Sequence, residues 1–229
     1  MGEGPGERRG RPGGWHHGPV PNVPELSTLL AGYRAAGETE AADVERMTRL
    51  AATARDPWSR SSLPLHFTAS ALVVHPETRR VLLRWHVRQQ CWLQVGGHGD
   101  PGETDPLRIA LREAAEETGL ADLAPWPDAA LRHAVICSVR ASAAEPAHEH
   151  ADLRYFLATS EPDAIIPEDA RSPLRWLTVA EARALAGGSN LRHTLDRAEE
   201  LLSRRIVPMP RPGARGPSPG TASAAHGDD

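Results

Sequence analysis

The sequence predicts an α/β sandwich of the α+β kind, with a mixed sheet and an N-terminal helical extension. Three observations lead to this prediction. Short segments rich in β-branched and aromatic residues come first, a glycine-rich loop and an amphipathic helix interrupt them, and more such segments and a terminal helix follow. The 229-residue chain is long enough for one domain with a sizeable core and two tails.

Both ends of the chain have the composition of disordered tails. Residues 1–23 and 207–229 are rich in glycine and proline and have no apolar periodicity. We expect the main domain to occupy residues 61–206.

Residues 24–60 are expected to form a helical extension. Two sets of residues have helical apolar spacing, on either side of Gly37: Leu26, Leu29, Leu30 and Tyr33 in the first, and Val44, Met47, Leu50 and Ala51 in the second. We expect these helices to pack on the domain as an appendage, and the alternative is a dimerisation arm.

From residue 65 onward the pattern is that of strands. The predicted strands have the sequences FTASALVV, RRVLLRWH, CWLQV, LRHAVICSV, DLRYFLAT and LRWLTV. Thr178 and Glu181 form a capping box for a helix near 179–186, which Gly187–Gly188 end. Asn190 can cap a last helix that runs to about Arg204.

The most informative segment, GGHGDPGETDPLRIALREAAEETGL, runs from Gly96 to Leu120 and joins a glycine loop to a helix. At about 100° per residue, Glu113, Glu116 and Glu117 share one face of that helix. The opposite apolar arc consists of Leu107, Ala110, Leu111, Ala114, Ala115 and Thr118. Ile109 falls outside that arc.

These carboxylates have the spacing that a metal site on a helix needs. Mg²⁺ prefers carboxylate oxygens and takes its remaining ligands from water and substrate phosphates. Arg112 and Glu116 form an i,i+4 pair that can hold Glu116 in place. Gly119 is a suitable C-cap residue. The alternative is an ordinary solvated helix face.

This segment resembles the Nudix box of the Nudix hydrolase superfamily, G-x5-E-x7-R-E-U-x-E-E-x-G-U, in which U is aliphatic. Gly97 to Glu103 matches the first part, and the stretch from Arg112 to Leu120 matches the last part if Ala114 is accepted as U. Eight residues instead of seven separate Glu103 from Arg112. We expect the loop-to-helix junction to absorb the extra residue.

The resemblance implies a Nudix-type α/β/α sandwich and a metal-dependent hydrolase that uses Mg²⁺ or Mn²⁺. The substrate class that it implies is a small nucleoside diphosphate linked to another moiety. Two alternatives of other classes are a non-catalytic Nudix-like nucleotide-binding domain and a diphosphate isomerase of the same fold. The isomerase would need a catalytic cysteine, for which Cys91 is the candidate.

Within this resemblance, Glu113 and Glu117 are the expected primary metal ligands because they lie one turn apart on the polar face. Glu116 is expected to be a further ligand or, through Arg112, a brace. The Gly97 carbonyl can reach the same ion because glycine leaves the backbone unobstructed.

Two further acids lie outside the helix. Glu103 is expected to add a metal ligand through water. The general base is either Glu113 or a carboxylate from a later loop, where Glu168 and Asp169 precede Trp176. A solvated loop is the alternative for those two residues.

A second group of polar residues is His148, His150 and Asp152, which share one face of a predicted strand. Three interpretations remain open: a zinc site without an evident fourth ligand, a polar strand edge, and the substrate end of the pocket. In the last case His98 and Arg154 are further expected contacts to substrate phosphate.

Composition narrows the partner classes. The net charge of −4 gives no basic surface for nucleic acid, and no apolar stretch approaches a membrane span. Cys91 and Cys137 form neither a disulfide framework nor a zinc-finger spacing. We therefore expect a cytoplasmic protein whose partner is a small molecule, with no nucleic acid and no membrane involved.

Overall fold

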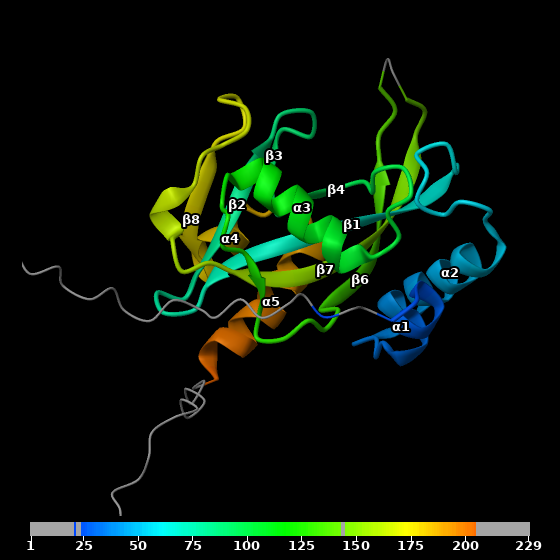
Figure 1. Cartoon of the computed structure of the whole chain (residues 1–229), viewed down its shortest axis with the longest axis horizontal. Coiled ribbons are helices and arrows are strands. Elements are labelled where there is room, and N and C mark those ends of the chain that lie inside the picture. The colour runs from blue at the N-terminus through cyan, green and yellow to red at the C-terminus, as the bar shows by residue number, and fades with distance from the viewer. Residues whose placement is uncertain (1–20, 22–23, 143–144, 205–229) are drawn as a thin grey trace, which may run out of the picture.

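The computed structural model describes residues 21, 24–142 and 145–204. Apart from residue 21, the expected tails at 1–23 and 207–229 lie outside the described residues. The described chain is a curled mixed sheet with helices against both of its faces (Figure 1). This confirms the predicted fold class.

The sheet is built around two long strands, β1 (Leu65–His75) and β7 (His148–Ala158), which pair in parallel. The remaining strands are β2 (Arg80–His86), β3 (Cys91–Leu93), β4 (Val95–Gly97), β5 (Ala124–Pro125), β6 (His133–Val139) and β8 (Leu174–Thr178). All other strand pairings are antiparallel. The order is β3-β2-β1-β7-β5, with β4 on β1, β6 on β7 and β8 on β2.

Side chains along each strand alternate between the two faces of the sheet, and each face has its own apolar core. On one face, Ala69 and Leu153 pack in a cluster with Leu107 and Ala114 of α3 (Pro106–Thr118). On the other face, Leu72 packs in a cluster with residues of α4 (Val179–Leu185) and α5 (Ser189–Ser203). The sheet therefore lies between helical layers, and α3 crosses its front in Figure 1.

The helices α1 (Leu26–Gly32) and α2 (Glu38–Thr53) pack on the same core as α3. Leu30 and Met47 are buried in that cluster, at 2% and 0% exposure. Polar contacts also join α2 to the domain. Glu40 accepts hydrogen bonds from Tyr33 and from Arg197 of α5, the latter at 2.6 Å.

The helix α3 begins where the sequence supplies a cap. The Asp105 side chain accepts hydrogen bonds from the amides of Leu107 and Arg108 at 3.0 and 3.2 Å, and a proline occupies the first turn. Gly119 ends the helix with φ of 71°, as expected of a C-cap residue. Because α3 begins at Pro106, the loop-to-helix junction between Glu103 and that residue can hold the extra residue of the motif.

Ile109, which falls outside the apolar arc of α3, is nevertheless fully buried. The glycine loop folds back over it, so that a β-carbon added to Gly99 would lie 3.0 Å from the Ile109 side chain. A helical wheel omits this contact because it comes from a neighbouring loop.

The capping box of Thr178 and Glu181 is present at the start of α4. The prediction that Asn190 caps α5 is wrong. This helix starts after Gly188 without a side-chain cap, and the side-chain amide of Asn190 instead donates to Cys137 Sγ at 3.1 Å. A short 3₁₀ turn, Pro162–Ala164, precedes β8. Within the described residues, no helix combines the length and hydropathy of a membrane span.

Candidate active site

Two carboxylates of α3 lie against the glycine loop. Glu113 and Glu117 are one turn apart, with side chains 17% and 12% exposed. The Gly96 amide donates to Glu117 at 3.0 Å, and a β-carbon added to Gly97 would lie 2.6 Å from a Glu113 oxygen. Gly96 has φ of 140° and passes so close to Ser70 that it also leaves no room for a side chain. The two glycines therefore permit the contact between loop and carboxylates.

Burial disfavours the ionised form of both carboxylates. Burial raises the pKa of Glu113, and it raises the pKa of Glu117 to about 7 although Arg84 and the Gly96 amide act in the opposite direction. Two partly buried carboxylates, with an unobstructed backbone beside them, are a donor set suited to a hard divalent cation. The residues present thus fit Mg²⁺ or Mn²⁺.

Arg112 joins the acids of the loop to the acids of the helix. Its guanidinium donates to Glu103 at 2.8 Å and to Glu113 and Glu116 at 3.0 Å each. It also donates to the carbonyl of His98 at 2.9 Å. This fork fixes the orientation of Glu113 relative to the loop.

Glu103 keeps its contact with Arg112 in spite of the extra residue of the motif. A hydrogen bond from Arg112 lowers the pKa of Glu103, and the Asp100 amide donates to the same carboxylate at 2.8 Å. Glu103 therefore closes a turn of the loop and pairs with the arginine.

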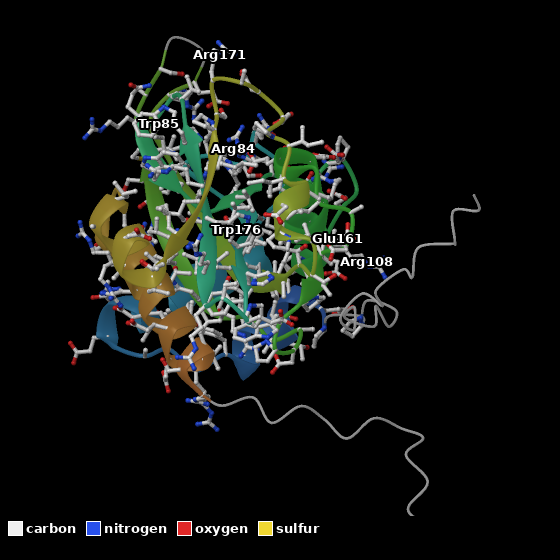
Figure 2. The ribbon with its side chains drawn as sticks, turned by 90° about the vertical axis from the view of Figure 1, so that its left-hand side faces the viewer. Arg84, Trp85, Arg108, Glu161, Arg171 and Trp176 are labelled. Atoms are coloured by element: carbon white, nitrogen blue, oxygen red, sulfur yellow. The ribbon has the colours of Figure 1, made fainter. Side chains whose placement is uncertain are left out.

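Arg84 of β2 belongs to this site and is missing from the residues expected from the sequence. It lies 2.9 Å from Glu117 and 3.6 Å from Glu168, and its own side chain is 14% exposed. In Figure 2 it lies on its strand below the loop that carries Arg171. A signal existed in the sequence: Arg84 is two residues from Leu82 on the same strand, so both side chains lie on the face that packs against α3 and its acids.

The two acids of the later loop are placed differently. Glu168 pairs with Arg84, which also pairs with Glu117, and its side chain is 57% exposed. Asp169 pairs with Arg171 at 2.7 Å. The structure therefore brings Glu168, and not Asp169, next to the carboxylates of α3.

The second group of polar residues separates into two parts. Asp152 and Arg154 are buried, at 4% and 2% exposure, and form an ion pair of 2.8 Å. Arg154 also donates to Thr194 and Cys137. Its burial and internal partners argue against the phosphate contact expected from the sequence.

His148 and His150 lie instead with His98 and with His66 of β1, which sequence reasoning missed. Burial lowers the pKa of His66, and it lowers the pKa of His150 to about 4. His66 is one of many polar positions in a strand, and only the pairing of β1 with β7 places it opposite His150.

Several solved structures are similar to this chain. The C. elegans Ap4A hydrolase binary complex is 18% identical over 59% of this chain and 96% of that chain, with a TM-score of 0.47. A Nudix-family hydrolase from Clostridium perfringens is 26% identical over 60% and 95%, with a TM-score of 0.43. The E. coli dihydroneopterin triphosphate pyrophosphohydrolase is 19% identical over 57% and 92%, also with a TM-score of 0.43.

No curated protein matches the chain. The family model described as the NUDIX domain matches residues 64–198, which is more than half of the sequence. The matched region contains the glycine loop, the helix α3 and the whole sheet. The chain therefore belongs to the Nudix family and is a diphosphate hydrolase of the Nudix type.

Proposed function

We propose that this protein is a metal-dependent hydrolase that cleaves a diphosphate bond in a nucleoside diphosphate linked to another moiety. The observation that carries the proposal is the position of Glu113 and Glu117, two carboxylates one turn apart that lie against Gly96 and Gly97. Each of them pairs with an arginine that is shared with further acids, and burial still raises the pKa of both. This favours a divalent ion as an additional counter-charge.

In this proposal Glu113 and Glu117 hold Mg²⁺ or Mn²⁺, with the Gly97 carbonyl as a further ligand. Glu116 and Glu103 act mainly through Arg112, which contacts both of them. When bound, the ion neutralises charge on the diphosphate and lowers the pKa of a bound water. Gly97 keeps the loop free of a side chain, so that a phosphate can approach the carboxylates closely.

We propose Glu168 as the general base, with Glu113 as the alternative. Glu168 shares Arg84 with Glu117 and is exposed enough to contact a water molecule. The protein would act on a small molecule, and the neighbours described as Ap4A hydrolase and dihydroneopterin triphosphate pyrophosphohydrolase are consistent with that class. A cytoplasmic location stays a prediction.

The competing functions make different demands on the site. A non-catalytic nucleotide-binding domain would not need the box acids, and all of them are present here. The isomerase would need Cys91 near those acids. In the structure Cys91 Sγ would lie only 2.9 Å from a β-carbon added to Gly187, so it packs against the turn between α4 and α5.

The test is a panel of nucleoside diphosphate derivatives and dinucleoside polyphosphates, assayed with Mg²⁺ and with Mn²⁺. Products are separated by chromatography. We expect at least one compound to be hydrolysed only when the metal is present, and we expect Glu117→Gln to lower kcat by about 100-fold or more.

Glu200→Gln is the matched control, because Glu200 is an exposed helical acid of α5 paired with Arg204. Turnover by Glu117→Gln at the parent rate would refute the metal assignment. Nucleotide binding by calorimetry without hydrolysis of any compound would favour the non-catalytic alternative.

A further inference from the structure

Four histidines converge on the side of the sheet away from α3. His66 Nε2 lies 3.0 Å from His98 Nε2, and His148 Nε2 lies 3.1 Å from His150 Nε2. The ring centroid of His66 lies 5.0–5.2 Å from the ring centroids of the other three histidines. We call these four residues the histidine cluster.

The strand register explains why the cluster forms. In the parallel pair of β1 and β7, His66 is the partner of His150. His148 and His150 alternate with Ala151 and Leu153, which pack in the cluster of α3, so the histidines point to the other face. His98 follows β4, whose last residue Gly97 pairs with Ala69 of β1. Two strands and one loop therefore place the four imidazoles next to one another.

Two of the imidazoles have a fixed tautomer. His66 Nδ1 lies 3.3 Å from the Ser62 carbonyl, and His148 Nδ1 lies 2.9 Å from the Pro146 carbonyl. A carbonyl oxygen only accepts, so each Nδ1 carries the proton. In the neutral rings the lone pair is then on Nε2, which faces the centre of the cluster. Metal-binding histidines are commonly oriented by such an outer hydrogen bond.

The distances between the nitrogens suit a small tetrahedral ion. With bonds of about 2.0–2.1 Å, two imidazole nitrogens on one zinc ion are about 3.3 Å apart. The facing pairs are within about 0.3 Å of that spacing, and the ligand atoms of His66, His148 and His150 all lie within 4.8 Å of one another. His98 adjoins this group through its Nε2, which lies 3.0 Å from His66 Nε2.

We propose that His66, His98, His148 and His150 form a binding site for a divalent transition-metal ion of the zinc type. The site is separate from the carboxylates of α3, which suit hard cations, whereas imidazole nitrogen favours Zn²⁺, Co²⁺, Ni²⁺ or Cu²⁺. A cavity of about 40 Å³ adjoins the cluster, with Arg60 and Glu145 both in its lining.

The geometry favours a metal over a substrate phosphate at this place. Two Nε2 atoms that face each other at 3.0–3.1 Å cannot both carry a proton, so each facing pair lacks one of the two charges that would attract phosphate. In each pair the Nε2 lone pair of one ring accepts a hydrogen bond from the Nε2–H of the other. A metal ion that displaced these two protons would bind all four nitrogens.

An ion at the cluster would also affect the loop of the proposed active site. His98 supplies an imidazole to the cluster, and its backbone carbonyl accepts the hydrogen bond from Arg112. The bound ion would therefore tie the start of this loop to β1 and β7. Its expected role is structural, because the part of the chain that the structure describes contains no hydrogen bond or ion pair between these histidines and Glu113 or Glu117.

Cobalt is the probe for the site. We expect the purified full-length chain, in excess Mg²⁺, to bind one equivalent of Co²⁺ with the visible absorption bands of a tetrahedral complex. Zn²⁺ should displace the cobalt and raise Tm by about 5–10 °C at one hundred times its Kd. His98→Gln and His150→Gln should each lose the tetrahedral spectrum and most of the shift in Tm.

Three control variants should keep the spectrum. They are His193→Gln, which changes an exposed histidine of α5, Glu117→Gln, which alters only the carboxylate site, and the double variant His16→Gln/His17→Gln, which removes adjacent histidines near the N-terminus. His98 lies in a loop, so its variant leaves β1 and β7 unchanged, and circular dichroism checks the fold. Absence of tetrahedral Co²⁺, or its retention in His98→Gln and His150→Gln, would overturn the proposal.

Loss of the spectrum in the His16→Gln/His17→Gln variant would also overturn it, because the ion would then bind elsewhere. The measurement is independent of hydrolysis. A failure of the proposed enzymatic function therefore leaves the outcome for the histidine cluster unaffected.

Discussion

Glu113 of α3 lies directly against Gly97 of β4: a β-carbon on that glycine would stand 2.6 Å from one carboxylate oxygen and 2.9 Å from the other. The obstacle is the end of a flexible side chain and not backbone. Adding a methyl group would therefore move the carboxylate while the fold stays in place.

Gly97→Ala is accordingly expected to separate activity from stability. We predict that kcat falls by about 10- to 100-fold, because the displaced Glu113 no longer holds the productive geometry. The free energy of unfolding should change by about 1 kcal/mol or less. Steady-state assays and urea unfolding measure the two quantities. Gly32→Ala is the control, since nothing lies within 4 Å of that position, and unchanged kcat in Gly97→Ala would contradict the prediction.

Arg112→Lys tests the fork that joins loop and helix. Lysine keeps the charge but cannot donate simultaneously to Glu103, Glu113 and Glu116 in the arginine geometry. We predict a loss of kcat of about 100-fold with a smaller change in KM. Arg108→Lys is the control on the same helix, because Arg108 is 57% exposed and forms an ion pair with Asp105 at 3.4 Å. It lies at the outer surface in Figure 2. Equal kinetics for the two variants would count against the bracing role.

Met47→Ala tests whether the helical extension and the domain unfold together. Met47 is fully buried in the core that contains α3. We expect its truncation to reduce the free energy of unfolding by about 2–5 kcal/mol and to leave a single unfolding transition. Thermal and chemical denaturation measure this, with Thr48→Ala, at an exposed position of the same helix, as the control. A separate early transition for the extension would show that it folds on its own.

Stability at acid pH should depend on Glu40. Burial of this carboxyl acts to raise its pKa, but hydrogen bonds from Arg197, Tyr33 and the Ala36 amide outweigh it and lower the pKa from 4.5 to about 2. A depressed folded pKa contributes stability above the unfolded value, and this is lost as the pH falls through the folded value.

The measurement is urea unfolding of wild type and Glu40→Gln between neutral pH and pH 2. We expect the variant to be less stable by about 1–2 kcal/mol at neutral pH, and the difference to shrink as the pH falls from about 4.5 to about 2. Glu45→Gln is the control, because Glu45 is an exposed acid of the same helix. A difference that stayed constant with pH would refute the assignment.

The sequence predicted those parts of the fold that local chemistry determines. Gly119 ends α3, and Thr178 with Glu181 begins α4, because a cap involves only residues within one turn of each other. The same holds for the acidic face of α3, which follows from helical spacing. The family resemblance then implied the Nudix-type α/β/α sandwich, which strand patterns alone would not have named.

The residues that were missed or misplaced depend on contacts between distant segments. Arg84 joins the site across the gap between β2 and α3, and His66 meets His150 only through the register of a parallel pair. Arg154 was expected to face a ligand but points into a buried network with Asp152 and Thr194. A strand pattern identifies which residues share a face, but not which element covers that face.

The parallel pairing of β1 with β7 has a consequence for how this domain forms during synthesis. Thr68 and Asp152, hydrogen-bonded partners across that pair, are 84 positions apart in the chain. The two middle strands of the sheet therefore cannot meet until most of the polypeptide has left the ribosome. We expect nascent β1, one of the most apolar segments, to remain unpaired for most of translation, and hence to depend on protection from aggregation at that stage.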